Sequence, residues 1–188
     1  AYHLARRFRL FERLFPETAE FLGEEANHYP HTFLTRVFED TDRRVADDKP
    51  VTPAFLFAAL LWHPLQAEWS RLETEGMAPD DALNKAASRV LRAQTRRVSL
   101  PKRFSEGVRE IWSLQARFDR AKGKRALSLL GHPRFRAGFD FLVLRSRSGE
   151  ADPELATWWQ DLLETPAQQR PAKLGLKPRG RNRGKAPA

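Results

Sequence analysis

The clearest chemical pattern in this sequence is an excess of basic side chains between residues 85 and 147. That stretch holds 17 lysines and arginines against 4 acidic residues, although the whole chain has a net charge of only +9. Arginines outnumber lysines 25 to 8 in the chain, and the planar guanidinium group fits phosphate oxygens. Because solubility alone does not require such an excess, the pattern predicts a surface for a polyanion such as a nucleic acid.

Two groups of basic residues form the candidate contact surface. Arg89, Arg92 and Arg96 are spaced by 3 and 4 residues, so one face of a helix would carry all of them. Other members lie near expected helix starts, where free backbone N–H groups also favour phosphate. The complete set of candidate nucleic-acid-binding residues is Arg89, Arg92, Arg96, Arg97, Lys102, Arg103, Lys122, Lys124, Arg125, Arg134 and Arg136. No motif for reading base edges accompanies them, so we expect little sequence specificity.

The sequence contains no pattern that we assign to catalysis or to a metal site. Asp40 and Asp42 have the spacing that holds two metal ions in nucleotidyl transfer, but that chemistry needs both carboxylates on one face of a strand. Their flanks indicate a helix, where positions i and i+2 diverge. His28 and His31 are separated by Pro30 and have no third ligand nearby. The chain has no cysteine either, and we expect no catalytic residue, metal or cofactor in it.

Composition indicates an all-α fold, a helical bundle. Leucine and alanine occur 24 times each, whereas isoleucine, valine and tyrosine together occur 10 times. The first two residue types favour helices and the other three favour strands. Periodicity and proline positions predict helices over 4–15 and 31–47, from Pro53, Pro79, Pro101 and Pro133, and over 125–130 and 153–164.

One of these helices is expected at the centre of the domain. The segment from Ala54 to Trp62 has no polar face, which is typical of a fully surrounded helix. We expect Pro64 to kink or end it. Among the residues expected to face inward elsewhere, Val45 and Trp158 lie on the apolar stripes of their helices.

We expect the chain to divide into a helical body over residues 1–165, which carries the nucleic-acid-binding surface, and a tail over residues 166–188. The tail holds 7 basic and no acidic side chains and has few residues to bury, so we expect it to be disordered. The most apolar run, residues 53–62, is far shorter than the about 20 residues of a membrane-spanning helix. We therefore expect no membrane partner, and the lack of cysteine suits a cytoplasmic location.

Several short motifs occur in one order along the chain. They are TPAFLFAALLWHPL at residues 52–65, LPKR at 100–103, EIWSLQ at 110–115, GKRA at 123–126, HPRFRA at 132–137 and WW at 158–159. Together with the basic tail, this series resembles the C-terminal body and RNA-binding region of bacterial poly(A) polymerases. These enzymes share a superfamily with the tRNA nucleotidyltransferases.

The resemblance implies a function. Enzymes of this family add AMP from ATP to RNA 3′ ends, which marks transcripts for decay, and an α/β catalytic head with a Gly-Gly or Gly-Ser loop holds their Mg²⁺ and ATP. This sequence has no Gly-Gly, and Asp40 and Asp42 do not correspond to the acids of the head. The resemblance therefore implies a chain that grips single-stranded RNA, lacks the head and transfers no AMP. The implied partners are RNA, the catalytic head of a longer protein and RNA-decay proteins.

Two other interpretations stay open at this point. The chain could be a helical adaptor that binds proteins through its aromatic stripes, while the basic surface serves only solubility. Replacing Arg92, Arg96 and Arg103 with glutamate would then leave its function intact. It could also be the body of a tRNA CCA-adding enzyme, because only the resemblance separates tail addition from CCA addition.

Overall fold

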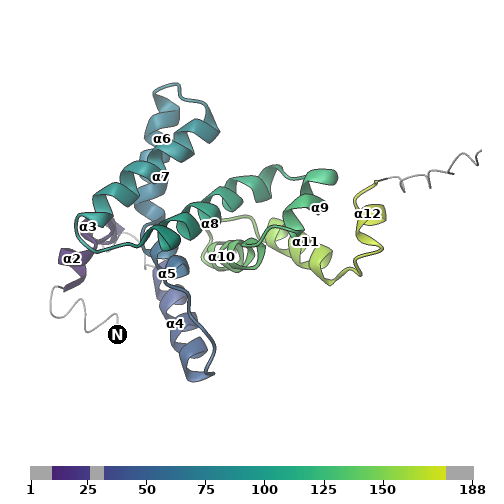
Figure 1. Ribbon diagram of the computed structural model, residues 1–188, viewed down its shortest axis with the longest axis horizontal. Helices are drawn as coiled ribbons and strands as arrows, with labels where there is room; N and C mark the ends of the chain where they lie inside the picture. The colour runs from purple at the N-terminus through teal and green to yellow at the C-terminus, as the bar shows by residue number, and fades with distance from the viewer. Residues whose placement is uncertain (1–9, 26–31, 177–188) are drawn as a thin grey trace, which may run out of the picture.

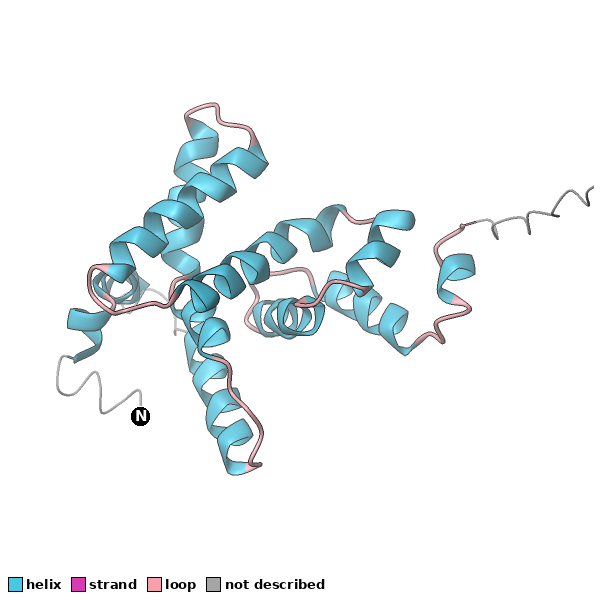
Figure 2. Ribbon diagram, viewed as in Figure 1, coloured by secondary structure: helices cyan, strands magenta, loops and turns pink. Residues whose placement is uncertain are grey.

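All regular elements that the structure describes are α-helices. The structure is a computed structural model, and it describes residues 10–25 and 32–176. Figures 1 and 2 show helices joined by loops, with no strand in the described part of the chain. The helices are α2 (Leu10–Leu14), α3 (Pro16–Glu25), α4 (Thr32–Ala46), α5 (Pro53–Leu60), α6 (Trp62–Thr74), α7 (Pro79–Thr95), α8 (Lys102–Arg120), α9 (Lys124–Leu130), α10 (Phe135–Arg147), α11 (Pro153–Glu164) and α12 (Arg170–Lys173). The predicted all-α fold is confirmed.

Helix α8 is the axis of the arrangement. In Figure 1, α6 and α7 form a hairpin that projects to one side, α4 projects to the other, and α9 to α12 lie toward its far end. Helices α5 and α10 pack directly on α8. Because α8 has 19 residues, it extends about 28 Å at 1.5 Å per residue. Side chains at its two ends are therefore held far apart by one rigid element.

Two hydrophobic cores lie along α8. The larger core contains the fully buried indoles of Trp62 and Trp112, and the Trp112 Nε1–H donates to the Ala58 carbonyl at 3.0 Å. The smaller core surrounds Trp159, whose Nε1–H donates to the Phe118 carbonyl at 3.3 Å. Helix α8 contributes residues to both cores and so joins them. None of the described helices is long and apolar enough to cross a membrane.

The central apolar segment forms two helices instead of one. Leu61 departs from helical geometry at φ −100° and ψ 10°, so α5 ends before it and α6 begins after it. The sequence predicts the interruption at Pro64, whereas Pro64 lies in the first turn of α6 and the break precedes it. Proline has no N–H for the carbonyl four positions earlier, which belongs to Leu60. The buried Thr18 hydroxyl donates to this carbonyl instead, at 2.7 Å.

Local periodicity misses three helices, namely α3, most of α6 and α12, and misplaces two side chains. Helix α3 and most of α6 fall where the sequence analysis assigns no helix, although Pro16 and Glu17 are a typical helix start. Val45 is 64% exposed because the end of α4 projects beyond the core, so its predicted inward position is wrong. Trp158 is 37% exposed, so its predicted inward position is also wrong; its ring meets that of the buried Trp159 edge-on at a centroid distance of 4.9 Å.

Ordered structure continues past residue 165. Helix α12 folds back toward α11, and the Arg170 Nη2–H donates to the Leu163 carbonyl at 2.8 Å. The first part of the predicted tail is therefore attached to the body by hydrogen bonds. Outside the described residues lie the rest of that tail, the start of the first predicted helix and the histidine pair, that is, residues 177–188, residues 4–9, His28 and His31.

Candidate nucleic-acid interface

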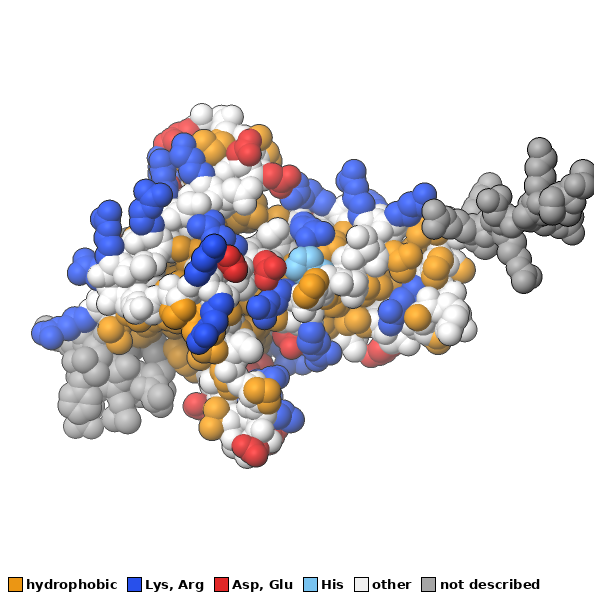
Figure 3. Space-filling model, in the orientation of Figure 1, with side chains coloured by type: hydrophobic (Ala, Val, Ile, Leu, Met, Phe, Trp, Pro, Cys, Tyr) orange, Lys and Arg blue, Asp and Glu red, His pale blue; other side chains and the backbone are white. Residues whose placement is uncertain are grey.

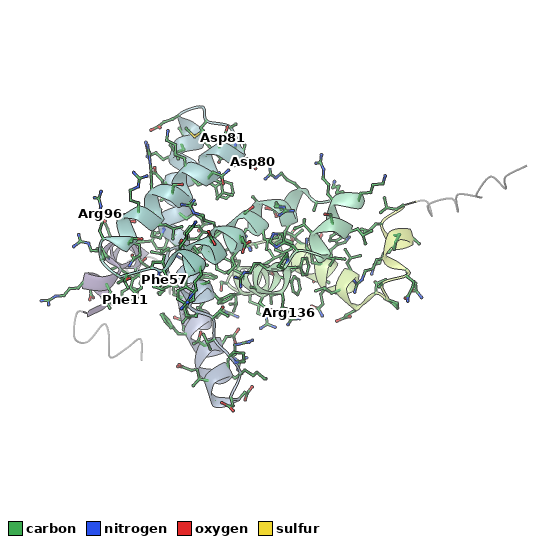
Figure 4. The ribbon with its side chains drawn as sticks, viewed as in Figure 1. Phe11, Phe57, Asp80, Asp81, Arg96 and Arg136 are labelled. Atoms are coloured by element: carbon green, nitrogen blue, oxygen red, sulfur yellow. The ribbon has the colours of Figure 1, made fainter. Side chains whose placement is uncertain are left out.

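One group of candidate cations lies where α7 ends and α8 begins. Helix α7 buries Leu83 and Leu91 in the larger core, so its opposite face carries basic side chains into solvent. Figure 4 shows Arg96 at the C-terminal end of α7, with its side chain pointing away from the neighbouring helices. Four exposed cations here form no ion pair with any described residue, and we term them the α7–α8 cluster: Arg92, Arg96, Arg97 and Arg103.

A second group lies at the far end of α8. Gly123 has a φ of 54°, a conformation that costs glycine little and strains other residues, and it turns the chain from α8 into α9. The exposed cations around this turn, which we term the α9 cluster, are Lys122, Lys124 and Arg125. They also form no ion pair with a described residue. Figure 3 shows lysine and arginine side chains on the visible face around α7, α8 and α9.

The other four candidate cations are paired with carboxylates. The pairs are Arg89–Glu68, Lys102–Glu106, Arg134–Glu110 and Arg136–Asp140, with N–O distances of 2.5, 3.7, 3.1 and 3.0 Å. The cationic partners are 44% to 89% exposed. Exposed pairs of this kind contribute at most about 1 kcal/mol each, so a phosphate can compete for the cation.

Arg89 is bound more firmly than the other three. Its partner Glu68 lies on α6 and also accepts hydrogen bonds from Arg71 at 2.8 and 2.9 Å. The pKa of Glu68 is lowered from 4.5 to about 2. The hydrogen bond from Arg71 is the main cause, partial burial opposes it, and the hydrogen bond from Arg89 adds a smaller contribution. Arg89 therefore ties α7 to α6, and we assign it a structural role.

The candidate cations do not form a single patch. The α7–α8 cluster and the α9 cluster lie at opposite ends of α8, so about 28 Å separates them. In Figure 4, Arg136 lies on α10, well away from Arg96. Between the two clusters, the Arg134–Glu110 pair neutralises part of the α8 surface. A bound strand would therefore meet free cations at two separate places.

Three other basic residues of the same region differ in whether their side chains are free to contact a phosphate. Lys85 is exposed and unpaired among the described residues, and its position four residues before Arg89 extends the α7 stripe by helical spacing alone. Arg109 donates to the Ser88 hydroxyl at 3.1 Å, and Arg120 pairs with Asp80 at 2.6 Å. Sequence spacing gives no sign of these two contacts, because the partners lie 21 and 40 residues away.

Acidic residues do not add a metal site to this surface. Asp40 and Asp42 lie on α4, and Asp40 pairs with Arg43 at 3.0 Å. No group of three histidine or acidic side chains in the described part of the chain could hold a metal ion. The described residues therefore offer no such ligand group for the Mg²⁺ that the family resemblance implies, and we derive no chemical step through it.

Comparison with known proteins gives the family. The family described as "Polymerase A arginine-rich C-terminus" matches residues 75–187. The chain belongs to this family. The match includes every candidate cation, from Arg89 to Arg136. The resemblance seen in the sequence motifs is thus confirmed.

Most of this chain aligns with the sequences of poly(A) polymerase I from several bacteria. The chain is 36% identical over 173 residues to that of Salmonella typhi and 36% identical over 171 residues to that of Haemophilus influenzae. It is 37% identical over 174 residues to that of Escherichia coli O157:H7. Each alignment covers 90% of this chain but only 37% or 38% of the relative. The chain thus spans little more than a third of the length of these relatives.

Proposed function

We propose that this chain is the RNA-binding part of a poly(A) polymerase, which holds the RNA strand whose 3′ end receives AMP. The observation that carries this proposal is the set of exposed cations without a carboxylate partner in the α7–α8 and α9 clusters. Membership in the arginine-rich family and the names of the relatives support it. The described residues offer no acidic site for the transfer itself, so we assign to this chain only the binding of RNA.

Single-stranded RNA fits this surface better than a duplex. The free cations lie at the ends of α8 with paired residues between them, and a flexible strand can follow such an interrupted track. Contacts made by Arg and Lys to phosphates carry no sequence information, so the proposed binding is only weakly sequence-dependent. It depends strongly on salt, with a log–log slope of about −0.7 for each phosphate contact.

Two observations weigh against the alternatives. An adaptor surface needs a contiguous apolar patch, but the exposed large apolar side chains among the described residues, Leu14, Val45 and Trp158, lie on three different helices. The relatives named above are poly(A) polymerases, which favours tail addition over CCA addition.

The experiment compares two triple variants that lose the same charge. Arg92, Arg96 and Arg103 become glutamine in the test variant, and glutamine keeps the helix propensity of arginine. At about 1 kcal/mol per lost contact, the affinity for a fluorescein-labelled single-stranded RNA should fall by about 100-fold. The magnitude of the salt slope should fall by about 2.

The control variant removes three cations from the α4 arm, where no cluster lies. Arg36 and Arg43 lie on α4 and Lys49 follows it, and changing them to glutamine should leave the affinity within about twofold of the unaltered chain. Equal losses in the two variants would show that only net charge matters. No loss in either would support the adaptor hypothesis and overturn the proposal.

A further inference from the structure

A pocket of about 240 Å³ lies between α6, α8 and α10 and has no part in the basic clusters. Helix α6 contributes Trp62 and Trp69, α8 contributes Asp119, and α10 contributes Arg145. Its volume is below the usual range for drug-sized ligands, about 300–1,000 Å³, and suits one planar ring system.

Two of the residues that line this pocket each carry a buried N–H group without an acceptor. Neither Trp69 Nε1 nor Arg145 Nε has a hydrogen-bond partner among the described residues. The rest of Arg145 is fixed: Nη1 donates to Gln115 Oε1 at 3.2 Å, and Nη2 donates to the Glu150 carbonyl at 3.0 Å. Its guanidinium carbon lies 4.6 Å from the ring centroid of Trp62. Unpaired buried donors destabilise a fold, and few occur in native proteins, so they call for an explanation.

Acceptors and polar groups also face this pocket. Asp119 is exposed at the edge of the pocket, and partial burial raises its pKa, although the nearby charges of Arg145 and Arg120 oppose that rise. Gln66 also lines the pocket. The pocket is thus lined by aromatic, amide and carboxylate residues. That combination matches a planar heterocycle that donates a hydrogen bond.

We propose that the pocket binds one unstacked nucleobase that carries an exocyclic amine, with Asp119 accepting a hydrogen bond from the amine. The inference rests on the proposed RNA binding, because Asp119 precedes Lys122 of the α9 cluster by three residues. Phosphate contacts at that cluster would bring a base of the same strand to the pocket. Stacking and hydrogen bonding of single bases are the usual way in which proteins bind unpaired RNA.

The test compares two RNA octamers that differ only in the amine. One consists of adenosine and the other of purine riboside, which lacks the exocyclic amino group, and both carry a fluorescein label for anisotropy. The unaltered chain should bind the adenosine octamer about tenfold more tightly, which is the contribution of one charge-assisted hydrogen bond. Asp119→Asn should remove this preference, and Trp69→Phe should weaken the binding of both octamers.

Stability measurements separate binding from folding. Circular dichroism and thermal unfolding should show that both variants keep the cooperative helical fold, although Trp69→Phe loses some packing against the larger core and melts slightly lower. Trp158→Phe, on exposed α11 surface, is the matched control and should leave both affinities unchanged.

Each outcome decides between the two proposals. If both octamers bind equally, or if Asp119→Asn keeps the preference, the pocket proposal is overturned while RNA binding stands. If neither octamer binds, the proposed function fails and the pocket proposal fails with it.

Discussion

Replacing Thr18 with valine tests why the central apolar segment breaks into α5 and α6. The Thr18 side chain is fully buried, and its hydroxyl is the only hydrogen-bond donor to the Leu60 carbonyl within the described residues. In a continuous helix this carbonyl would accept from the N–H of residue 64, which is a proline and has none. Valine has nearly the same shape as threonine, so the substitution removes the donor with little change in packing.

The expected loss follows from the buried carbonyl that stays unpaired. Such a group costs about 1–3 kcal/mol, and the added methyl group of valine offsets at most about 0.8 kcal/mol of that cost. The net loss in the free energy of unfolding is then about 0.2–2.2 kcal/mol, with a midpoint of about 1.2 kcal/mol. For a chain of this size, 1 kcal/mol corresponds to about 2–4 °C, so at the midpoint the melting temperature should fall by about 2–5 °C.

Thermal and urea unfolding followed by far-UV circular dichroism measure this loss. Thr74→Val is the matched control, because the exposed Thr74 hydroxyl donates at 2.9 Å to the Ser70 carbonyl within its own helix, and its loss should stay within about 0.5 kcal/mol. Adding Pro64→Ala supplies an N–H near Leu60, so Thr18→Val should cost less in that background. Equal losses for the two threonine variants would refute the reasoning.

Two further substitutions test packing and charge. In Gly138→Ala the new methyl group would lie 2.6 Å from Leu114 Cδ1. The overpacking should cost about 1–3 kcal/mol, which exceeds the gain of about 1 kcal/mol in helix propensity, so the urea midpoint should fall. An unchanged urea midpoint would contradict this expectation. Glu68→Gln removes a carboxylate whose pKa is lowered to about 2 by Arg71 and Arg89. A lowered pKa stabilises the fold above the unfolded value of 4.5 and loses this effect as the pH falls toward 2. The urea midpoint should therefore drop at about pH 7 and drop less at about pH 3, and an equal drop at both would count against the pairing.

Local signals in the sequence were sufficient for most helices. Pro53, Pro79 and Pro153 each begin a helix in the structure as predicted, because proline at the first helical position needs no N–H partner. Asp152 caps the last of these by accepting from the Glu154 N–H at 2.8 Å. Such signals lie within a few residues of the feature that they determine, so a sequence displays them directly.

Contacts between distant segments could not be predicted in the same way. Glu150 accepts from Trp62 Nε1 at 3.1 Å and lies 2.9 Å from His63 Nε2, across 88 and 87 residues of sequence. The pocket beside Trp69 likewise requires three helices to meet. No periodicity or short spacing in the sequence marks these residues, because only the packing of the helices brings them together.

The same limitation explains why net charge overstates the basic surface. The stretch before residue 85 holds 15 acidic against 9 basic side chains, and it supplies Glu68 to Arg89 and Asp80 to Arg120. Part of the positive charge after residue 85 therefore lies in ion pairs that join α7 to α6 and α8 to α7. Among the described residues, the exposed candidate cations that such carboxylates do not reach lie from the last turn of α7 to the start of α8 and around Gly123. Charge counts along the sequence indicate a polyanion partner, but the fold decides which cations are free to meet it.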